Sequence, residues 1–196
     1  MKKNVLIFFA VVTFLGCSKK DDGSFTPTLP PITQTGENTF GCYANGILIT
    51  PRDGTGTFNS PDRGMILFDV PGPRYEINVH DFASEKTGKI IIHIINLDSI
   101  GIGEYNIHES NCLDGIDSPL TNNIHCRIYD YDENKYKFFC SIENSGLINV
   151  TRYDNGILSG TFSCTAVNRD DPTEFIEITE GRFDINGYKL PTTKFP

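Results

Sequence analysis

From Thr39 to the C-terminus, apolar residues occur in short runs that polar turn residues separate. Apolar and polar positions alternate within many of these runs, which places alternate side chains on opposite faces of an extended strand. Phe138, Cys140 and Ile142 share one face in this way. The pattern predicts an all-β protein of about ten to eleven strands with almost no helix. The strands are expected at 40–44, 47–50, 65–70, 75–81, 89–97, 103–108, 124–131, 136–142, 147–153, 157–167 and 174–185.

The turns between the runs indicate how the strands connect. Asn45-Gly46 is typical of a two-residue type I′ hairpin turn. Short connections, 144–146 among them, join the last five strands and predict a C-terminal antiparallel meander. Gly181 interrupts the last strand and indicates a bulge. The run 90–95 is apolar on both faces and is expected to form the most central strand. Because so many strands must protect their edges, we expect an antiparallel β-sandwich, with a flattened β-barrel as the alternative.

Composition agrees with a folded, β-rich chain. The 196 residues include 18 glycines and 11 prolines, and 38% are hydrophobic, which is too many for a disordered protein. The formal net charge of −8 disfavours non-specific binding to nucleic acid.

The N-terminus has a pattern of its own. Lys2 and Lys3 precede an apolar run that is too short to span a bilayer as a helix, which is typical of a secretory signal peptide over residues 1–16. Phe14-Leu15-Gly16-Cys17 resembles the lipobox of bacterial lipoproteins, and this resemblance implies that Cys17 carries acyl chains such as palmitate. The alternative is an ordinary signal peptide in which Cys17 is coincidental. Several acyl chains on one residue would give a stable membrane anchor.

The segment after Cys17 predicts a tether. Proline, serine and threonine dominate it, so residues 17–37 are expected to comprise the lipidated cysteine and a flexible linker, with one β domain over 38–196. Lys19-Lys20-Asp21-Asp22 resembles, displaced by one residue, the surface-export signal of Bacteroidota lipoproteins. The resemblance implies an outer-membrane protein at the cell surface, and the periplasmic face is the alternative.

The body also resembles a family of uncharacterised Bacteroidota lipoproteins. The matching stretches are 35–46 (TGENTFGCYANG), 158–162 (LSGTF) and 178–185 (ITEGRFDI), which bracket most of the chain. The resemblance implies a lipid-anchored β domain and brings no catalytic residues with it.

Five cysteines remain beyond Cys17 among the six of the chain, so at least one is expected to be unpaired. Cys112 and Cys126 bracket the longest expected loop, 109–123, and form the first predicted disulfide. We expect Cys140 opposite Val150 and Cys164 opposite Gly146, too far apart for a bridge. Cys140 is therefore expected to be a small buried residue, and Cys42 with Cys164 forms a weaker second pair.

Motifs for metal binding or catalysis are weak in this sequence. The four histidines, His80, His93, His108 and His125, lie on different strands without zinc-ligand spacing, and His93 is expected to be a hydrogen-bonded core residue. Residues 130–134 imitate the start of a calcium loop, but a polar hairpin turn fits them better. The glycine-rich stretch 53–57 precedes no helix, and Ser159 lies at a strand start rather than on a nucleophile elbow. We expect no cofactor, metal or catalytic residue.

These features predict an outer-membrane-anchored lipoprotein that acts as a non-enzymatic binding or interaction module for a protein or glycan. Two alternatives stay open. One is a glycan-acting hydrolase that uses a carboxylate pair, because only geometry selects such a pair. The other is a carrier that holds a small apolar ligand inside a barrel.

Overall fold

The computed structural model describes residues 25–57, 61–70, 72–83, 86 and 88–196. It contains ten strands and three short helical segments. The strands are β1 (Thr39–Ala44), β2 (Ile47–Ile49), β3 (Met65–Val70), β4 (Arg74–His80), β5 (Lys89–Ile95), β6 (Gly103–Asn106), β7 (Asn123–Asp130), β8 (Lys135–Asp154), β9 (Ile157–Asn168) and β10 (Phe175–Asn186). The helical segments are α1 (Leu97–Ile100), η1 (Gly115–Asp117) and η2 (Leu190–Thr192).

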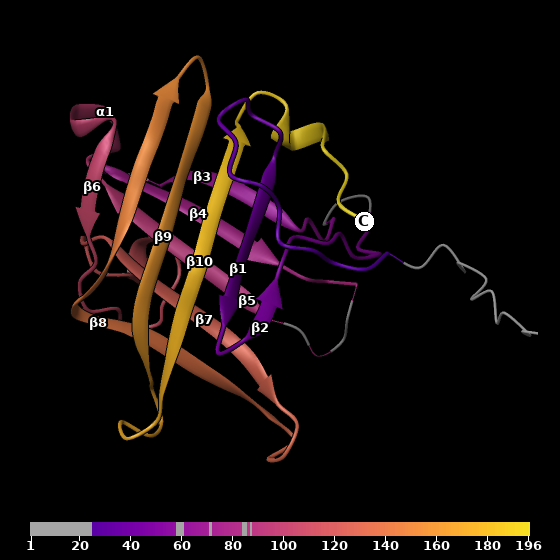
Figure 1. Cartoon of the computed structure of the whole chain (residues 1–196), viewed down its shortest axis with the longest axis vertical. Helices are drawn as coiled ribbons and strands as arrows, with labels where there is room; N and C mark the ends of the chain where they lie inside the picture. The colour runs from indigo at the N-terminus through magenta and orange to yellow at the C-terminus, as the bar shows by residue number, and fades with distance from the viewer. Residues whose placement is uncertain (1–24, 58–60, 71, 84–85, 87) are drawn as a thin grey trace, which may run out of the picture.

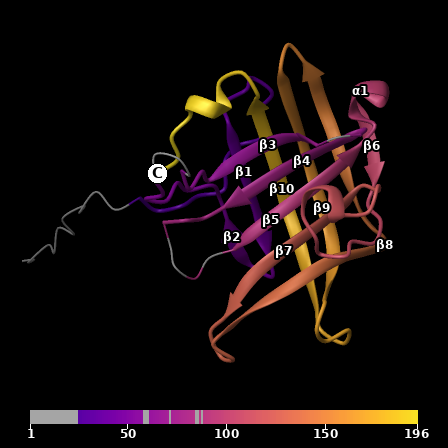
Figure 2. The same cartoon turned by 180° about the vertical axis from the view of Figure 1, so that it is seen from behind.

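All ten strands belong to one antiparallel sheet, with the order β2-β1-β10-β9-β8-β7-β5-β4-β3 and with β6 paired to β8. The sheet curls strongly, so that β1, β10 and β9 form one layer and β3, β4 and β5 cross behind them (Figures 1 and 2). The all-β prediction is confirmed, and so is the C-terminal meander, which runs from β7 to β10. Because one continuous sheet makes both layers, the arrangement fits the flattened-barrel alternative as an open half-barrel.

The interior of the curled sheet is filled with side chains. Phe40, Phe139 and Phe183 are each at most 2% exposed, and they come from three different strands. On β5, Ile90, Ile92 and Ile94 point into this core, while the intervening residues are also buried but face the other way. β5 is therefore apolar on both faces as predicted. Its predicted position was wrong, because the middle of the strand order is occupied by β8.

β8 is the longest strand and connects the two layers. Its first part pairs with β7 and its second part with β6, while β9 follows it almost throughout. The turn predicted at 144–146 is wrong, because the chain continues through a bulge between Ser141 and Gly146. A Cβ on Gly146 would lie 2.0 Å from the carbonyl oxygen of Ser163, so only glycine allows this close approach.

The other turn predictions are confirmed. Asn45 and Gly46 both have positive φ, as a type I′ turn between β1 and β2 requires. β10 has its predicted bulge between Ile178 and Gly181, where Glu180 adopts a φ of 51°.

The predicted tether is wrong at its C-terminal end, because residues 33–37 are held against β10. Asp184 is 1% exposed and accepts hydrogen bonds from the Thr33 hydroxyl and from the backbone N–H groups of Thr35, Gly36 and Glu37. Burial raises the pKa of Asp184, but these hydrogen bonds and one from Ser159 outweigh it, so the pKa is lowered overall. A buried carboxylate thus fixes a segment whose composition alone is that of a linker. Cys17 and the predicted signal peptide lie outside the described residues.

Among the described residues, helix is confined to short segments. α1 has four residues, and η1 and η2 have three each. In the part of the chain that the structure describes, no helix is long and apolar enough to cross a membrane.

Candidate functional site

The connection between β6 and β7, residues 107–122, folds over the outer face of β4, β5 and β7 (Figure 2). We call it the β6–β7 loop. It buries the outward-facing residues of β5, including His93 at 0% exposure. Three groups of contacts hold it there, which is an unusually firm attachment for a long loop.

The first group is a buried hydrogen-bond network on Glu76 and His93. Glu76 Oε2 lies 3.0 Å from His93 Nε2 and accepts a hydrogen bond of 2.8 Å from the backbone N–H of Gly115. His93 Nδ1 lies 3.2 Å from Ser118 Oγ. Burial raises the pKa of Glu76, but the hydrogen bonds from His93 and Gly115 outweigh it and lower the pKa, so Glu76 stays ionised at neutral pH. Arg74 extends the network, since its guanidinium donates to the carbonyl oxygens of Gly115 and Ser118.

Ser118, His93 and Glu76 have the residue types of a catalytic triad, but their arrangement is structural. The serine lies at Nδ1 of the histidine and the carboxylate at Nε2, the reverse of the triad order. Ser118 is 4% exposed, and its hydroxyl also accepts a hydrogen bond from Asn123. His93 is hydrogen-bonded and fully buried as expected of a core residue, but it lies on the outer face of β5 beneath the β6–β7 loop and not in the core inside the sheet.

The second group centres on Asp114. Its carboxylate lies 2.6 Å from Lys89 Nζ and 3.0 Å from His125 Nε2. The hydrogen bond from His125 is the main cause that lowers the pKa of Asp114, and Lys89 contributes further. The pKa of His125 is lowered, chiefly by burial, although Asp114 opposes this shift.

The third group is the disulfide between Cys112 and Cys140, whose Cα atoms are 5.3 Å apart. It replaces both predicted disulfides. The Cys112–Cys126 prediction is wrong because Cys126 pairs with Phe139 in the sheet, so that it points into the core, whereas Cys140 is on the opposite face beneath the loop. The expectation that Cys140 lies opposite Val150 is wrong as well, since its partners are His125 and Val167.

The Cys42–Cys164 prediction is wrong because β10 lies between β1 and β9. Two strand spacings amount to about 10 Å, and a disulfide requires Cα atoms within about 7 Å. The predicted register of Cys164 opposite Gly146 is confirmed. Cys42, Cys126 and Cys164 are buried free thiols, and burial raises the pKa of each, which makes them unreactive.

Although it is held so firmly, the β6–β7 loop presents large aliphatic side chains to solvent. Leu113 is 47% exposed, Ile116 72% and Leu120 64%. Exposed carboxylates accompany them on the loop, at Glu109 and Asp117. The loop itself, together with Glu143 on β8, lines a hollow of about 290 Å³, where His108 Nδ1 is 2.8 Å from the Glu143 carboxylate. The surface thus combines apolar side chains with an acidic surround.

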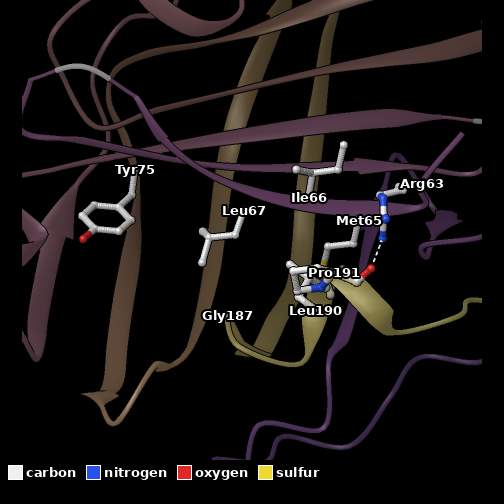
Figure 3. Close-up of a pocket in the computed structure, with 8 residues that line it drawn as sticks. All are labelled: Arg63, Met65, Ile66, Leu67, Tyr75, Gly187, Leu190 and Pro191. Carbon is white, nitrogen blue, oxygen red and sulfur yellow. Dashed lines mark hydrogen bonds between the residues drawn. The ribbon is translucent and has the colours of Figure 1, made fainter. Parts of the chain in front are cut away.

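A second concave site lies at the open side of the sheet, and we call it the edge cavity. It has a volume of about 310 Å³ and lies between β3 and the chain that follows β10 (Figure 3). Met65, Ile66, Leu67 and Tyr75 line it from β3 and β4, and Gly187, Leu190, Pro191 and Arg63 complete it.

The remaining sequence candidates take ordinary structural positions. Residues 131–134 form the predicted polar hairpin turn between β7 and β8, where the Asp130 carboxylate accepts backbone hydrogen bonds and pairs with Lys137. Ser159 is buried on β9 and donates to Asp184. Asp53, in the glycine-rich stretch, accepts a hydrogen bond from the backbone of Gly64. Within the described ranges, no group of three or more His, Cys, Asp or Glu side chains could hold a metal ion.

Sequence reasoning missed Glu76 and Asp184, the two carboxylates that organise the structure. Glu76 pairs with His93 across the β4–β5 ladder. The predicted strands 75–81 and 89–97 place Glu76 and His93 on adjacent strands, but pairing their facing ends would set Glu76 opposite Ile94, so only the observed register brings the two together. Comparisons with protein-family models, with curated proteins and with solved structures found no match.

Proposed function

We propose that this protein is an outer-membrane-anchored, surface-exposed lipoprotein whose β domain is a non-enzymatic binding module. Cys17 would carry the lipid, and the β6–β7 loop would contact a partner protein. The lipobox-like stretch that ends at Cys17 supports the anchor. The Cys112–Cys140 bridge agrees with an oxidising compartment outside the cytoplasm.

One observation carries the binding role. The β6–β7 loop is fixed by a disulfide and by buried hydrogen bonds from Glu76, yet it exposes Ile116 and Leu120. A loop that is already ordered loses little conformational entropy on binding. Covering its exposed apolar side chains with a partner protein removes them from water and so favours the complex. Because Glu109 and Asp117 accompany them, the fitting partner is a protein with an apolar pocket and a basic rim.

The two other functions receive less support from the structure. A carrier of the expected kind needs a wide apolar lumen inside the sheet. Packed side chains, Phe40, Phe139 and Phe183 among them, fill that interior. A hydrolase of the expected kind needs a carboxylic acid with a raised pKa. In the described part of the chain, the carboxyl groups whose pKa departs from its usual value all have a lowered pKa. Where three carboxylates converge, Asp130, Glu133 and Glu174 surround the ammonium group of Lys137.

The binding role is tested by capture from the native cell envelope with three matched proteins. These are the full chain, the Ile116→Ser/Leu120→Ser double variant, and a Phe175→Ser control, since Phe175 is 52% exposed on β10. The full chain and the control are expected to retain the same protein, the double variant is expected to lose it, and added salt is expected to weaken capture. Equal capture by all three would refute the assignment of the loop. Capture that survives protease treatment of the envelope would instead indicate a glycan.

The anchor and the location are tested separately. Cys17→Ala is expected to abolish incorporation of a palmitate analogue and to release the chain from membranes. Protease added to intact cells is expected to remove the wild-type protein. Degradation that begins only after the outer membrane is broken would assign the protein to the periplasmic face.

A further inference from the structure

The edge cavity has an apolar wall with one cationic group. Met65, Leu67 and Leu190 provide aliphatic surface, while Arg63 is the only charged residue that lines it among the residues described. In Figure 3, Arg63 and Tyr75 lie at opposite ends of the labelled residues, with the aliphatic side chains between them. Along the chain the lining runs from Arg63 to Leu67, a distance of about 13 Å, and Tyr75 on β4, which pairs with Asp69, extends it further. The site is a narrow, elongated apolar groove.

Arg63 is available to bind an anion. In this acidic chain, Arg52, Arg152, Arg169 and Arg182 each lie within 3.2 Å of a carboxylate oxygen. Among the described residues no carboxylate pairs with Arg63, and its guanidinium donates instead to the backbone carbonyl of Pro191. A guanidinium has five N–H donors, and a carboxylate accepts two of them side by side. Arg63 therefore has donors to spare at one end of the groove.

The position of the cavity also favours a ligand. β3 is the last strand of the sheet, and the turn after β10 covers it only in part, through Leu190 and Pro191. A volume of about 310 Å³ is at the small end of the range for ligand sites. The space is suited to a slender aliphatic chain rather than to a large ring system.

We infer that the edge cavity binds the carboxylate of a medium-chain fatty acid, with the carboxylate on Arg63 and the hydrocarbon along Met65 and Leu67 towards Tyr75. This goes beyond the proposed function, because the site is separate from the β6–β7 loop. The aliphatic chain would cover the half-buried side chains of Leu67 and Tyr75, beneath which Met65 is 1% exposed, and the charge of Arg63 would be neutralised.

Met65 supplies a specific probe, since the chain contains only two methionines and the other is Met1. The full chain, with isotopically labelled methionine methyl groups and embedded in lipid nanodiscs, would be titrated with octanoate and followed by NMR. We expect a single methionine signal that shifts saturably, because Met1 lies in the predicted signal peptide and Met65 is the methionine that remains in the lipid-anchored chain. Octanol and the glycerol ester of octanoate, which lack the charge, are expected to bind at least about tenfold more weakly.

Arg63→Gln is expected to weaken octanoate binding by about tenfold or more and to leave octanol unaffected. Lys135→Gln is the matched control, because it removes the same charge from an exposed side chain on β8 and is expected to change nothing. An unmoved Met65 signal, or equal octanoate affinity in both variants, would overturn the inference. Envelope capture through the β6–β7 loop, measured on the same Arg63→Gln protein, is expected to persist. The two proposals can therefore fail independently.

Discussion

Removing the Cys112–Cys140 bridge tests how far one covalent link stabilises the fold. The bridge joins residues 28 positions apart. In the chain-entropy description, a closed loop of that length stabilises the native state by about 3.6 kcal/mol, because it restricts the unfolded chain. The Cys112→Ala/Cys140→Ala variant is therefore expected to be less stable by about 3 to 4 kcal/mol. With a urea dependence of about 2 kcal/mol per M, its unfolding midpoint falls by about 1.8 M.

The assay is urea unfolding of the wild type and the double variant, each with and without reductant. Reductant is expected to lower the midpoint of the wild type to near that of the variant. It is expected to leave the variant unchanged, because Cys42, Cys126 and Cys164 are free thiols. A loss below about 1 kcal/mol would refute the entropic reasoning. A reductant effect on the double variant would refute the assignment of the bridge.

Three further outcomes follow from buried groups. Asp184→Ala leaves the backbone N–H groups of residues 35–37 without their acceptor. We expect the free energy of unfolding in urea to fall by at least about 1.5 kcal/mol and proteases to cleave the N-terminal segment earlier. An unchanged cleavage pattern would contradict the role of Asp184. Burial, helped by Lys89 and Arg127, lowers the pKa of His80 from 6.5 to about 4, so the unfolded chain binds more protons between these values and stability falls as pH decreases through them. His80→Gln is expected to flatten that part of the melting temperature profile, and parallel profiles would count against it. Phe139 is 1% exposed, so Phe139→Ala is expected to lower the free energy of unfolding by about 3 to 5 kcal/mol. Phe175 is half exposed, so Phe175→Ala is expected to change it by no more than about 0.5 kcal/mol. Similar losses in the two variants would contradict the assignment of Phe139 to the core.

The strands could be predicted because their signal is local. Alternation of apolar side chains and pairs such as Asn45-Gly46 depend only on neighbouring residues, and the expected ranges agree with the observed strands within a few residues. The exception is β8, where a bulge and a turn produce the same polar interruption in the sequence. Treating that interruption as a turn placed Cys140 opposite Val150 and hid its proximity to Cys112.

The buried carboxylates could not be predicted in the same way. Asp184 and Glu76 lie in strands whose neighbours are apolar, and a charged residue there is normally taken as solvent-facing. Their partners, the backbone of residues 35–37 and of Gly115, come from loops whose path only the folded structure determines. The disulfide also depends on the path of a loop. Alternation along a strand predicts which face of the sheet Cys140 occupies, but it does not predict where the loop places Cys112.

The pairing of β1 with β10 also governs the order in which the molecule can be completed. Glu37 and Asp184 are hydrogen-bonded although 147 residues separate them in the chain. A ribosome makes β1 near the start and β10 near the end, so β1 cannot gain this partner until almost the whole chain exists, whereas β7, β8 and β9 can pair through short connections before then. Until β10 is made, the edge of β1 that faces it has no strand partner. The same strand therefore both pairs with β1 and, through Asp184, holds residues 33–37 of the segment that leads to Cys17.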